Sequence, residues 1–151
     1  MNRVDFNAEG VSAPTWKKKA GSFVLKALKI LGLKNWNLSV LFCNDEFIRS
    51  LNKQYRNRDE ATDVLSFALG ETIDEGSGEE RCFPGDIVIS LETLRKQAAS
   101  FGVDEDEELR RLLVHGILHL NGMDHAGNQS GEPMLVLQEK ILRELGGENI
   151  I

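Results

Sequence analysis

The chain has 151 residues, of which 41% are hydrophobic and 28% charged, and its formal net charge is −6. This size and composition suit one globular domain spanning residues 1–151. The acidic total argues against a protein that coats nucleic acid nonspecifically, and the chain lacks the apolar run of roughly 18 residues that spans a bilayer.

The beginning of the chain and its cysteines predict the compartment. The first ten residues lack the apolar stretch behind a basic flank that marks a signal peptide. Cys43 and Cys82 are the only cysteines and do not constitute a disulfide framework. We therefore expect a cytoplasmic protein without a membrane partner, and the sequence leaves its oligomeric state open.

The first third of the chain predicts strand, helix, strand and helix. Residues 1–8 favour a short leading strand or arm, and Pro14 opens a helical pattern of apolar residues that ends near Gly32. Residues 36–43 are rich in aromatic and apolar residues and predict a strand. Asn44 is suited to cap the helix that follows.

The middle of the chain predicts two strands on either side of a polar segment. Residues 62–69 and 86–89 have strand patterns, whereas residues 70–85 hold four glycines and one proline and predict a long exposed loop or hairpin tip. Ser90 is suited to cap the next helix, and Gly102 to end it.

The last third predicts two helices. Acidic residues at 104–108 favour the start of a helix that runs to about Leu120, where Asn121-Gly122 interrupts it. A polar loop at 127–133 precedes a final helix over 132–145. The whole order predicts an α+β fold with a small mixed sheet packed against helices.

All three histidines of the chain lie in one segment of eleven residues, HGILHLNGMDH. His115 and His119 are four apart, so on a helix their Cβ atoms lie about 5–6 Å from each other on one face. Gly122 can take the left-handed conformation that turns the chain back and brings in His125. The segment therefore predicts a metal site of three imidazoles on a helix and the turn after it.

The sequence does not determine which metal binds or whether a fourth protein ligand is present. Imidazole suits zinc, but also nickel, copper or iron. A closed structural zinc site normally has four protein ligands, and Cys43 or Cys82 would be the remaining candidates, although neither has a ligand-like spacing to the histidines. We favour one zinc ion with a fourth position open to water.

Two residues within the segment bear on the chemistry. The metzincin proteases share its histidine spacing, but they carry a glutamate as general base where this chain has Gly116. This difference argues against a standard metalloprotease. Asp124 adjoins the third histidine and could orient an imidazole or act as a base, although a role in the turn is the simpler interpretation.

The same segment resembles the H-G-x-L-H-L-x-G-x-D-H signature of the YbeY family of bacterial ribosomal-RNA maturation endoribonucleases. LNKQYRNRDEATDVLSFAL, PGDIVIS and MLVLQEKIL are similar to further blocks of that family, in the family's order over most of residues 44–145. Ala61 and Ala68 depart from the pattern, since the family usually has proline at both positions.

The resemblance implies a mixed four-stranded sheet with about five helices, and a metal, usually zinc, on His115, His119 and His125. It also implies a hydrolase that cuts single-stranded RNA in the maturation of 16S ribosomal RNA and in ribosome quality control, with the small ribosomal subunit as partner. Arg56 matches the arginine of the second block, which the resemblance marks as important for activity.

The chemistry of phosphodiester cleavage gives Arg56 a role of its own. A guanidinium can pair with two phosphoryl oxygens as charge develops on them. The alternative is a surface arginine paired with Asp59 or Asp63. Nearby basic side chains could extend a track for phosphates, namely Arg49, Lys53 and Arg58.

Two other functions remain open from the sequence. One is a metallohydrolase of a peptide or small amide, which would need a base other than position 116. The other is a non-catalytic ribosome-assembly factor that uses its metal only for folding. Replacement of His119 by alanine separates catalysis from folding, because only a structural metal would be needed for stability.

Overall fold

The computed structural model of the protein describes residues 1–74, 76, 79–125 and 131–151. Over these residues the chain forms a four-stranded mixed sheet and five helices, which confirms the predicted α+β class. None of these helices has the length and apolar character needed to cross a membrane.

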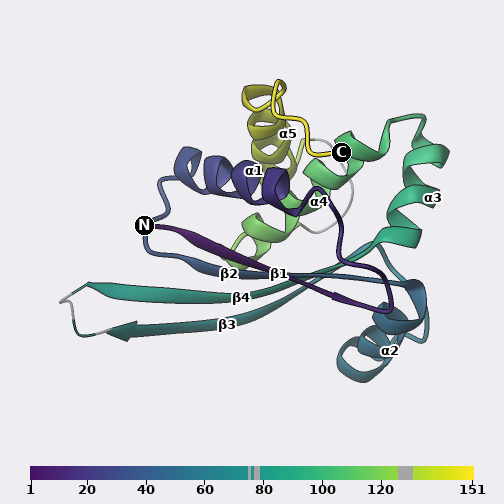
Figure 1. Ribbon diagram of the computed structural model, residues 1–151, viewed down its shortest axis with the longest axis horizontal. Helices are drawn as coiled ribbons and strands as arrows, with labels where there is room; N and C mark the ends of the chain where they lie inside the picture. Colours follow the sequence, from purple (N-terminus) through teal and green to yellow (C-terminus); the bar gives the residue numbers. More distant parts are fainter. Residues whose placement is uncertain (75, 77–78, 126–130) are drawn as a thin grey trace.

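The sheet has the strand order β1-β2-β4-β3 (Figure 1). Strands β1 (Arg3–Glu9), β2 (Asn37–Cys43) and β4 (Glu80–Ser90) are mutually parallel, whereas β3 (Val64–Asp74) runs antiparallel to β4. The first and third strands of the chain therefore form the two edges of the sheet.

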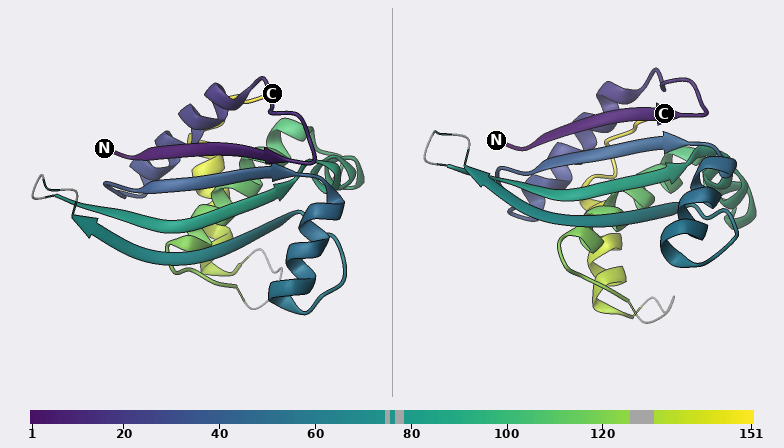
Figure 2. Two further views of the ribbon diagram at one scale, coloured as in Figure 1. Left: turned by 60° about the horizontal axis from the view of Figure 1, so that its bottom comes forward. Right: turned by 90° about the horizontal axis from the view of Figure 1, so that it is seen from below.

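One face of the sheet carries the main core. The alternation in β2 points Leu38, Val40 and Phe42 to this face, where helices α1 (Lys17–Ile30) and α4 (Glu105–Leu120) cover them. Helix α5 (Pro133–Glu144) packs on α4 rather than on the sheet (Figures 1 and 2). Helix α4 is thus buried between the sheet and α5.

The opposite face carries a smaller cluster under α2 (Asp45–Arg56). Ile48 of this helix packs with Cys43, Leu65 and Val88 of the sheet. The remaining helix, α3 (Leu91–Phe101), follows β4 directly. The first residue of α2, Asp45, contacts Ser90 at the end of β4, and its last residue, Arg56, contacts Ser66 near the start of β3.

The predicted helix caps are confirmed. The side chain of Asn44 accepts a hydrogen bond from the amide of Phe47, and that of Ser90 accepts one from Thr93. Gly102 ends α3 with a φ of 69°. These bonds satisfy amide groups that the first turn of a helix leaves without a partner.

Of the two predictions for residues 70–85, a long exposed loop or a hairpin tip, the structure confirms a hairpin, but strands occupy most of the segment. Residues 71–74 pair with 80–83, so β3 and β4 continue as a two-stranded arm. Its side chains on β3 are exposed on both faces, which removes the alternation that normally indicates a strand. The predicted polar loop at 127–133 lies mostly outside the described residues.

Candidate metal centre

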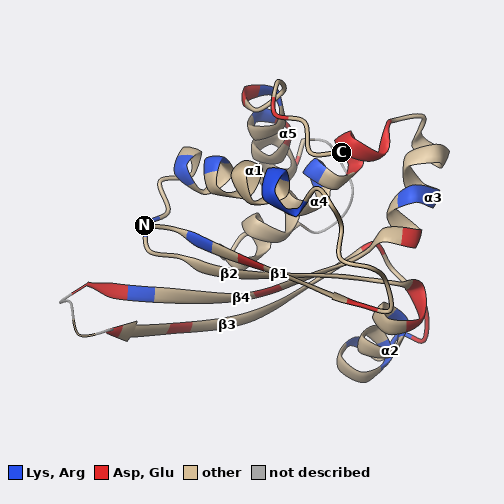
Figure 3. Ribbon diagram, viewed as in Figure 1, with Lys and Arg blue, Asp and Glu red and all other residues tan. Residues whose placement is uncertain are grey.

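Helix α4 positions the first two histidines. Asp104 caps the helix by accepting a hydrogen bond from the amide of Glu107, and acidic residues fill its first turn (Figure 3). Negative charge is favourable there because the amide groups at a helix N-terminus carry partial positive charge. His115 and His119 follow on one face near the other end of the helix.

The end of α4 brings in the third histidine. Gly122 has a φ of 87°, and its amide donates to the carbonyl of His119 while that of Met123 donates to Leu118. This left-handed glycine reverses the chain, as predicted. The ring centroid of His125 then lies 5.1 Å from that of His115 and 5.4 Å from that of His119.

The three imidazoles converge closely enough to share one ion. Each offers a nitrogen within 4.8 Å of the others, and the Nε2 atoms of His115 and His119 are 3.1 Å apart. Two nitrogens that bind a tetrahedral zinc at about 2.0–2.1 Å would lie about 3.3 Å apart. Among the described residues, this is the one group of histidine, cysteine or acidic side chains with such an arrangement.

A glutamine from α5 orients the first imidazole. The Oε1 atom of Gln138 lies 2.7 Å from Nδ1 of His115, while its Nε2 donates to Glu139. An amide oxygen only accepts, so Nδ1 of His115 carries the proton and Nε2 presents its lone pair to the cluster.

Burial favours the neutral form of His115 and His119. It lowers the pKa of His115 and that of His119 below the usual histidine value, and the neighbouring imidazoles lower the pKa of His119 further. Neutral imidazole is the form that binds a metal. The two histidines of α4 are therefore in the form that binds an ion at neutral pH.

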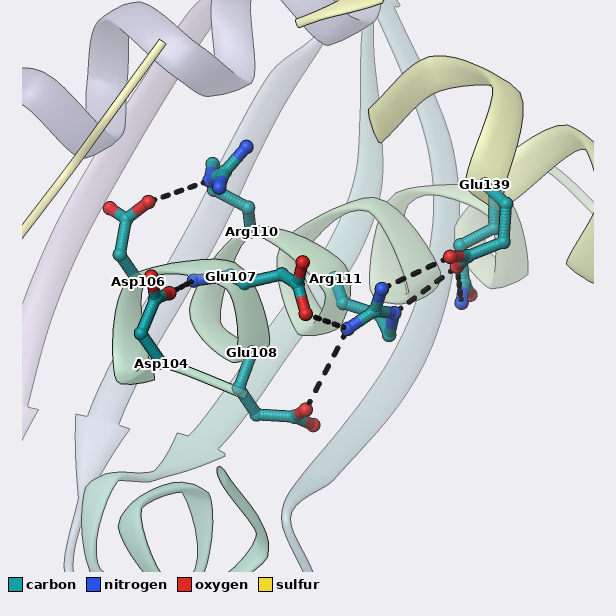
Figure 4. Close-up of polar contacts among 8 residues, drawn as sticks. Asp104, Asp106, Glu107, Glu108, Arg110, Arg111 and Glu139 are labelled. Carbon is teal, nitrogen blue, oxygen red and sulfur yellow. Dashed lines mark hydrogen bonds and ion pairs between the residues drawn. The ribbon is translucent and has the colours of Figure 1, made fainter. Parts of the chain in front are cut away.

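Gln138 donates to Glu139, which belongs to an ionic network between α4 and α5; Figure 4 shows the contacts of Arg111 with Glu107 and Glu139 in this network. Arg111 of α4 makes two hydrogen bonds to the carboxylate of Glu139 on α5, at 3.0 and 3.1 Å, and also contacts Glu107. Arg111 lowers the pKa of Glu139, so that this carboxylate stays charged. The network locks α5, and with it Gln138, against the helix that bears the histidines.

Arg56 lies at the same cavity as the histidines. This cavity of about 310 Å³ is lined by Arg56 from the end of α2, by His115 and His119, and by β3. One guanidinium nitrogen, Nη2, donates to the carbonyl of Ser66 at 2.9 Å. The arginine is therefore held by the edge strand and not by Asp59 or Asp63.

The three basic residues of the suggested phosphate track are placed differently. Arg49 and Lys53 both lie near the carboxylate of Asp59, at 2.8 and 3.9 Å, and Arg58 lies near Glu60. None of the three is among the described residues that line the cavity. Of these three residues and Arg56, only Arg56 is among the described residues that line the cavity with His115 and His119.

Comparison with known proteins identifies the family of the chain. The family model described as Endoribonuclease YbeY matches residues 4–146. The chain belongs to the YbeY family. An Endoribonuclease YbeY of Treponema denticola is 54% identical over 123 residues, covering 82% of this chain and 79% of the relative.

A further curated relative and a solved structure match over nearly the whole chain. The Endoribonuclease YbeY of Treponema pallidum (strain Nichols) is 43% identical over 144 residues, which cover 95% of this chain and 90% of the relative. The solution structure of TM1509 from Thermotoga maritima is 28% identical with a TM-score of 0.60, and the match covers 98% of this chain and 91% of that one.

The two departures from the YbeY pattern lie outside the histidine cluster. Ala68 pairs with Gly85 in the sheet, where the register shifts between Ala68 and Glu71. Ala61 lies exposed in the loop after α2. Neither alanine is a member of the metal-binding group, although Ala68 borders its cavity.

The residue at the position of the metzincin base faces the sheet. A Cβ atom on Gly116 would lie 2.8 Å from Cδ1 of Ile87 in β4. A glutamate there would therefore enter the core and not the cavity. The absence of a base at Gly116 is a consequence of how closely α4 crosses β4.

Cys43, Cys82 and Asp124 were also considered as residues of the site. The thiol of Cys43 donates a hydrogen bond to the carbonyl of Ile89, and burial raises the pKa of this thiol to about 12. Neither Cys43 nor Cys82 belongs to the described histidine group. Asp124 accepts from the amide of His125, and its carboxylate lies 4.0 Å from Nδ1 of His119, beyond a direct hydrogen bond.

Sequence reasoning missed Gln138 and its support by Glu139 and Arg111. Gln138 lies 23 residues from His115, on a different helix. The one signal was its polarity at a position that proves to be buried in an otherwise apolar helix face. Such a residue indicates a hydrogen bond but does not identify its partner.

Proposed function

We propose that this chain is a metal-dependent endoribonuclease that cuts single-stranded RNA in the cytoplasm. Its process would be the maturation of 16S ribosomal RNA and ribosome quality control, with the small ribosomal subunit as partner. The relatives named Endoribonuclease YbeY support the reaction class. The observation that carries the proposal is the single cavity shared by Arg56, His115 and His119.

His115, His119 and His125 are the residues that would hold the metal, which we assign as one zinc ion. Their three imidazole nitrogens and the spacing between His115 and His119 suit that ion. When bound, zinc supplies a Lewis acid that lowers the pKa of water and polarises a phosphoryl oxygen. Nickel or another divalent transition metal would fit the same donors.

Arg56 is the proposed catalytic residue of the chain itself. Its guanidinium carries five N–H donors, and Nη2 is engaged by the carbonyl of Ser66. The remaining donors can pair with the oxygens of a phosphodiester in the cavity. Such a contact stabilises the transition state more than the substrate, because negative charge on those oxygens grows during the reaction.

The alternative functions are less well supported. A peptide hydrolase needs a general base beside the ion, and the position of the metzincin base is closed by Ile87. A purely structural metal would suit a site with four protein ligands, whereas the described group has three. An open cavity beside that group favours catalysis.

The test pairs metal analysis of purified protein with RNA cleavage before and after chelation. We expect chelation to stop cleavage and added zinc to restore it, while peptide substrates remain uncut. His119→Ala should lose cutting but keep the melting temperature of the metal-free wild type. Full cleavage by metal-free protein would contradict the proposal, and loss of folding by His119→Ala would favour a structural metal.

A further inference from the structure

The one tyrosine of the chain stands exposed beside the candidate catalytic arginine. Tyr55 precedes Arg56 in the last turn of α2, and 57% of its surface is accessible. Its ring meets that of Phe67 on β3 edge to face, with centroids 5.4 Å apart and planes at 67°. Contact with Phe67 fixes the orientation of the ring, while more than half of the residue remains open to solvent.

Arg56 connects this aromatic pair to the cavity. Its guanidinium carbon lies 5.1 Å from the centroid of the Phe67 ring, within the range of a cation–π contact. The same side chain lines the cavity with His115 and His119. Arg56 therefore borders the cavity of the histidines and contacts Phe67, which in turn contacts Tyr55.

These residues gather at one edge of the sheet, beside the cavity. Strand β3 is an edge of the sheet, and Arg56 reaches it from α2 on one face while the histidines approach from the other. A chain that enters the cavity and crosses this edge over Arg56 would next meet the exposed ring of Tyr55. Successive phosphates of such a chain alternate with bases that need a surface to stack on.

We infer that Tyr55 and Phe67 form a subsite that stacks a nucleobase of the RNA strand next to the phosphate held by Arg56. This inference rests on the proposed function. The ligand is an unpaired base of any identity, because every base has a π-face and none of the three side chains reads a base edge. A base inside a duplex is already stacked and paired, so the subsite selects single-stranded RNA.

The competing explanation is that Tyr55 only covers the small core under α2. Phe67 packs against that cluster, which contains Cys43, Ile48 and Leu65. A cover needs apolar bulk of any shape, whereas a stacking platform needs a flat aromatic ring. Tyr55→Leu keeps the bulk and removes the ring, and Tyr55→Phe keeps both.

The test measures binding of a single-stranded RNA oligonucleotide to metal-free protein in the presence of chelator, so that no cleavage occurs. We expect Tyr55→Leu to weaken binding by about 5- to 100-fold, and Tyr55→Phe to bind within about twofold of the wild type. Phe101→Leu is the matched control, because Phe101 is a 65% exposed aromatic residue on α3. Thermal melting of each variant reports the contribution of packing.

A second set of oligonucleotides locates the stacked base. An abasic site moved along the strand should weaken binding to the wild type at one position and leave binding to Tyr55→Leu unchanged there. 2-Aminopurine at that position should be quenched by the wild type and by Tyr55→Phe, and less by Tyr55→Leu. Blunt-ended duplex RNA should bind all variants alike.

The outcomes separate this inference from the proposed function. Wild-type affinity in Tyr55→Leu overturns the subsite even where RNA is cleaved. Selective loss in Tyr55→Leu supports the subsite even where the metal-loaded protein cuts nothing, a result that would remove the proposed function. Equal loss in Tyr55→Phe and Tyr55→Leu, or no binding by the wild type, also overturns it.

Discussion

At the scale of single residues, the tautomer of His115 determines what the cluster can bind. An imidazole has one donor and one acceptor nitrogen when neutral, and Gln138 assigns the donor role to Nδ1. Without that acceptor, the ring would populate both tautomers and could turn away from the other two histidines. Gln138 is therefore a positioning residue for the metal, with no contact to substrate required.

Gln138→Leu tests this positioning role. We expect the affinity for zinc to fall about 10- to 100-fold, since loss of a hydrogen bond behind a ligating histidine has effects of this size. Competition with a chromophoric chelator measures it. Gln97→Leu, at a partly buried glutamine of α3, is the control and should leave zinc affinity unchanged. Equal affinities in both variants would show that His115 is oriented by other contacts.

Whether a feature of the site could be predicted from the sequence depends on how far apart in the chain the contacting residues lie. His115, His119 and His125 were predictable because helical spacing and one glycine determine their geometry locally. The contact of Arg56 with Ser66 and that of His115 with Gln138 depend on how separate elements pack. Residue types and spacings carry little information about such packing.

At the scale of elements, α4 crosses β4 closely at Gly116, next to the first histidine of the site. Gly116 and Gly21 are both in helix interiors, where glycine costs about 1 kcal/mol relative to alanine. Only Gly116 has a packing reason, because its Cβ would lie 2.8–2.9 Å from three carbons of Ile87.

Gly116→Ala should accordingly lower the free energy of unfolding by about 1–3 kcal/mol, since overpacking a core outweighs the gain in helix propensity. Urea denaturation measures it. In Gly21→Ala the added Cβ would lie 3.5 Å from Phe6, an ordinary contact. The free energy of unfolding of this control should rise by about 0.5–1 kcal/mol. A stabilised Gly116→Ala would mean that α4 can move away from the sheet.

A second link between elements holds α2, and thus the helix that carries Arg56, to α3. The carboxylate of Asp45 accepts hydrogen bonds from Ser90 and Thr93 at 2.6 Å and from Lys96 at 2.8 Å. Partial burial alone would raise the pKa of Asp45, but these bonds outweigh it and lower the pKa to about 2.

This shift predicts a pH dependence of stability. A carboxyl whose pKa is lowered on folding stabilises the protein above its unfolded pKa of about 3.9 and loses that effect as pH falls towards 2. Asp45→Asn should cost about 1–2 kcal/mol at pH 7, and the difference from wild type should shrink between about pH 4 and 2. Denaturation at several pH values measures it, with Asp86→Asn, at an exposed aspartate of β4, as control. A difference that does not change with pH would exclude an ionic contribution.

The elements themselves were predictable to different degrees. Helices with a buried face and capped ends, such as α3 and α4, show periodicity and end signals. In the outer half of the β3–β4 arm, exposed residues of β3 pair with largely half-buried residues of β4, and the glycines of this segment suggested a loop. Gly85 instead permits the close pairing, because a Cβ there would lie 2.0 Å from the carbonyl of Phe67.

At the scale of the whole molecule, the candidate site joins parts that fold from distant regions of the chain. Helix α4 supplies two imidazoles, the turn after it supplies the third, and α5 supplies the glutamine that orients the first. Metal binding would hold the turn and α5 in the arrangement that the folded state already has. Since the unfolded chain lacks this arrangement, binding free energy adds to folding stability.

Zinc should therefore raise the melting temperature, by an amount that grows with the logarithm of its free concentration divided by its Kd. At a free concentration 100 times its Kd, the gain is about 2.7 kcal/mol, which corresponds to roughly 5–10 °C for a domain of this size. Differential scanning calorimetry with buffered zinc measures the shift. Arg56→Ala should keep it, His119→Ala should lose it, and magnesium should produce none because that ion prefers oxygen ligands. A zinc shift that persists in His119→Ala would place the stabilising ion elsewhere in the chain and separate metal binding from the three histidines.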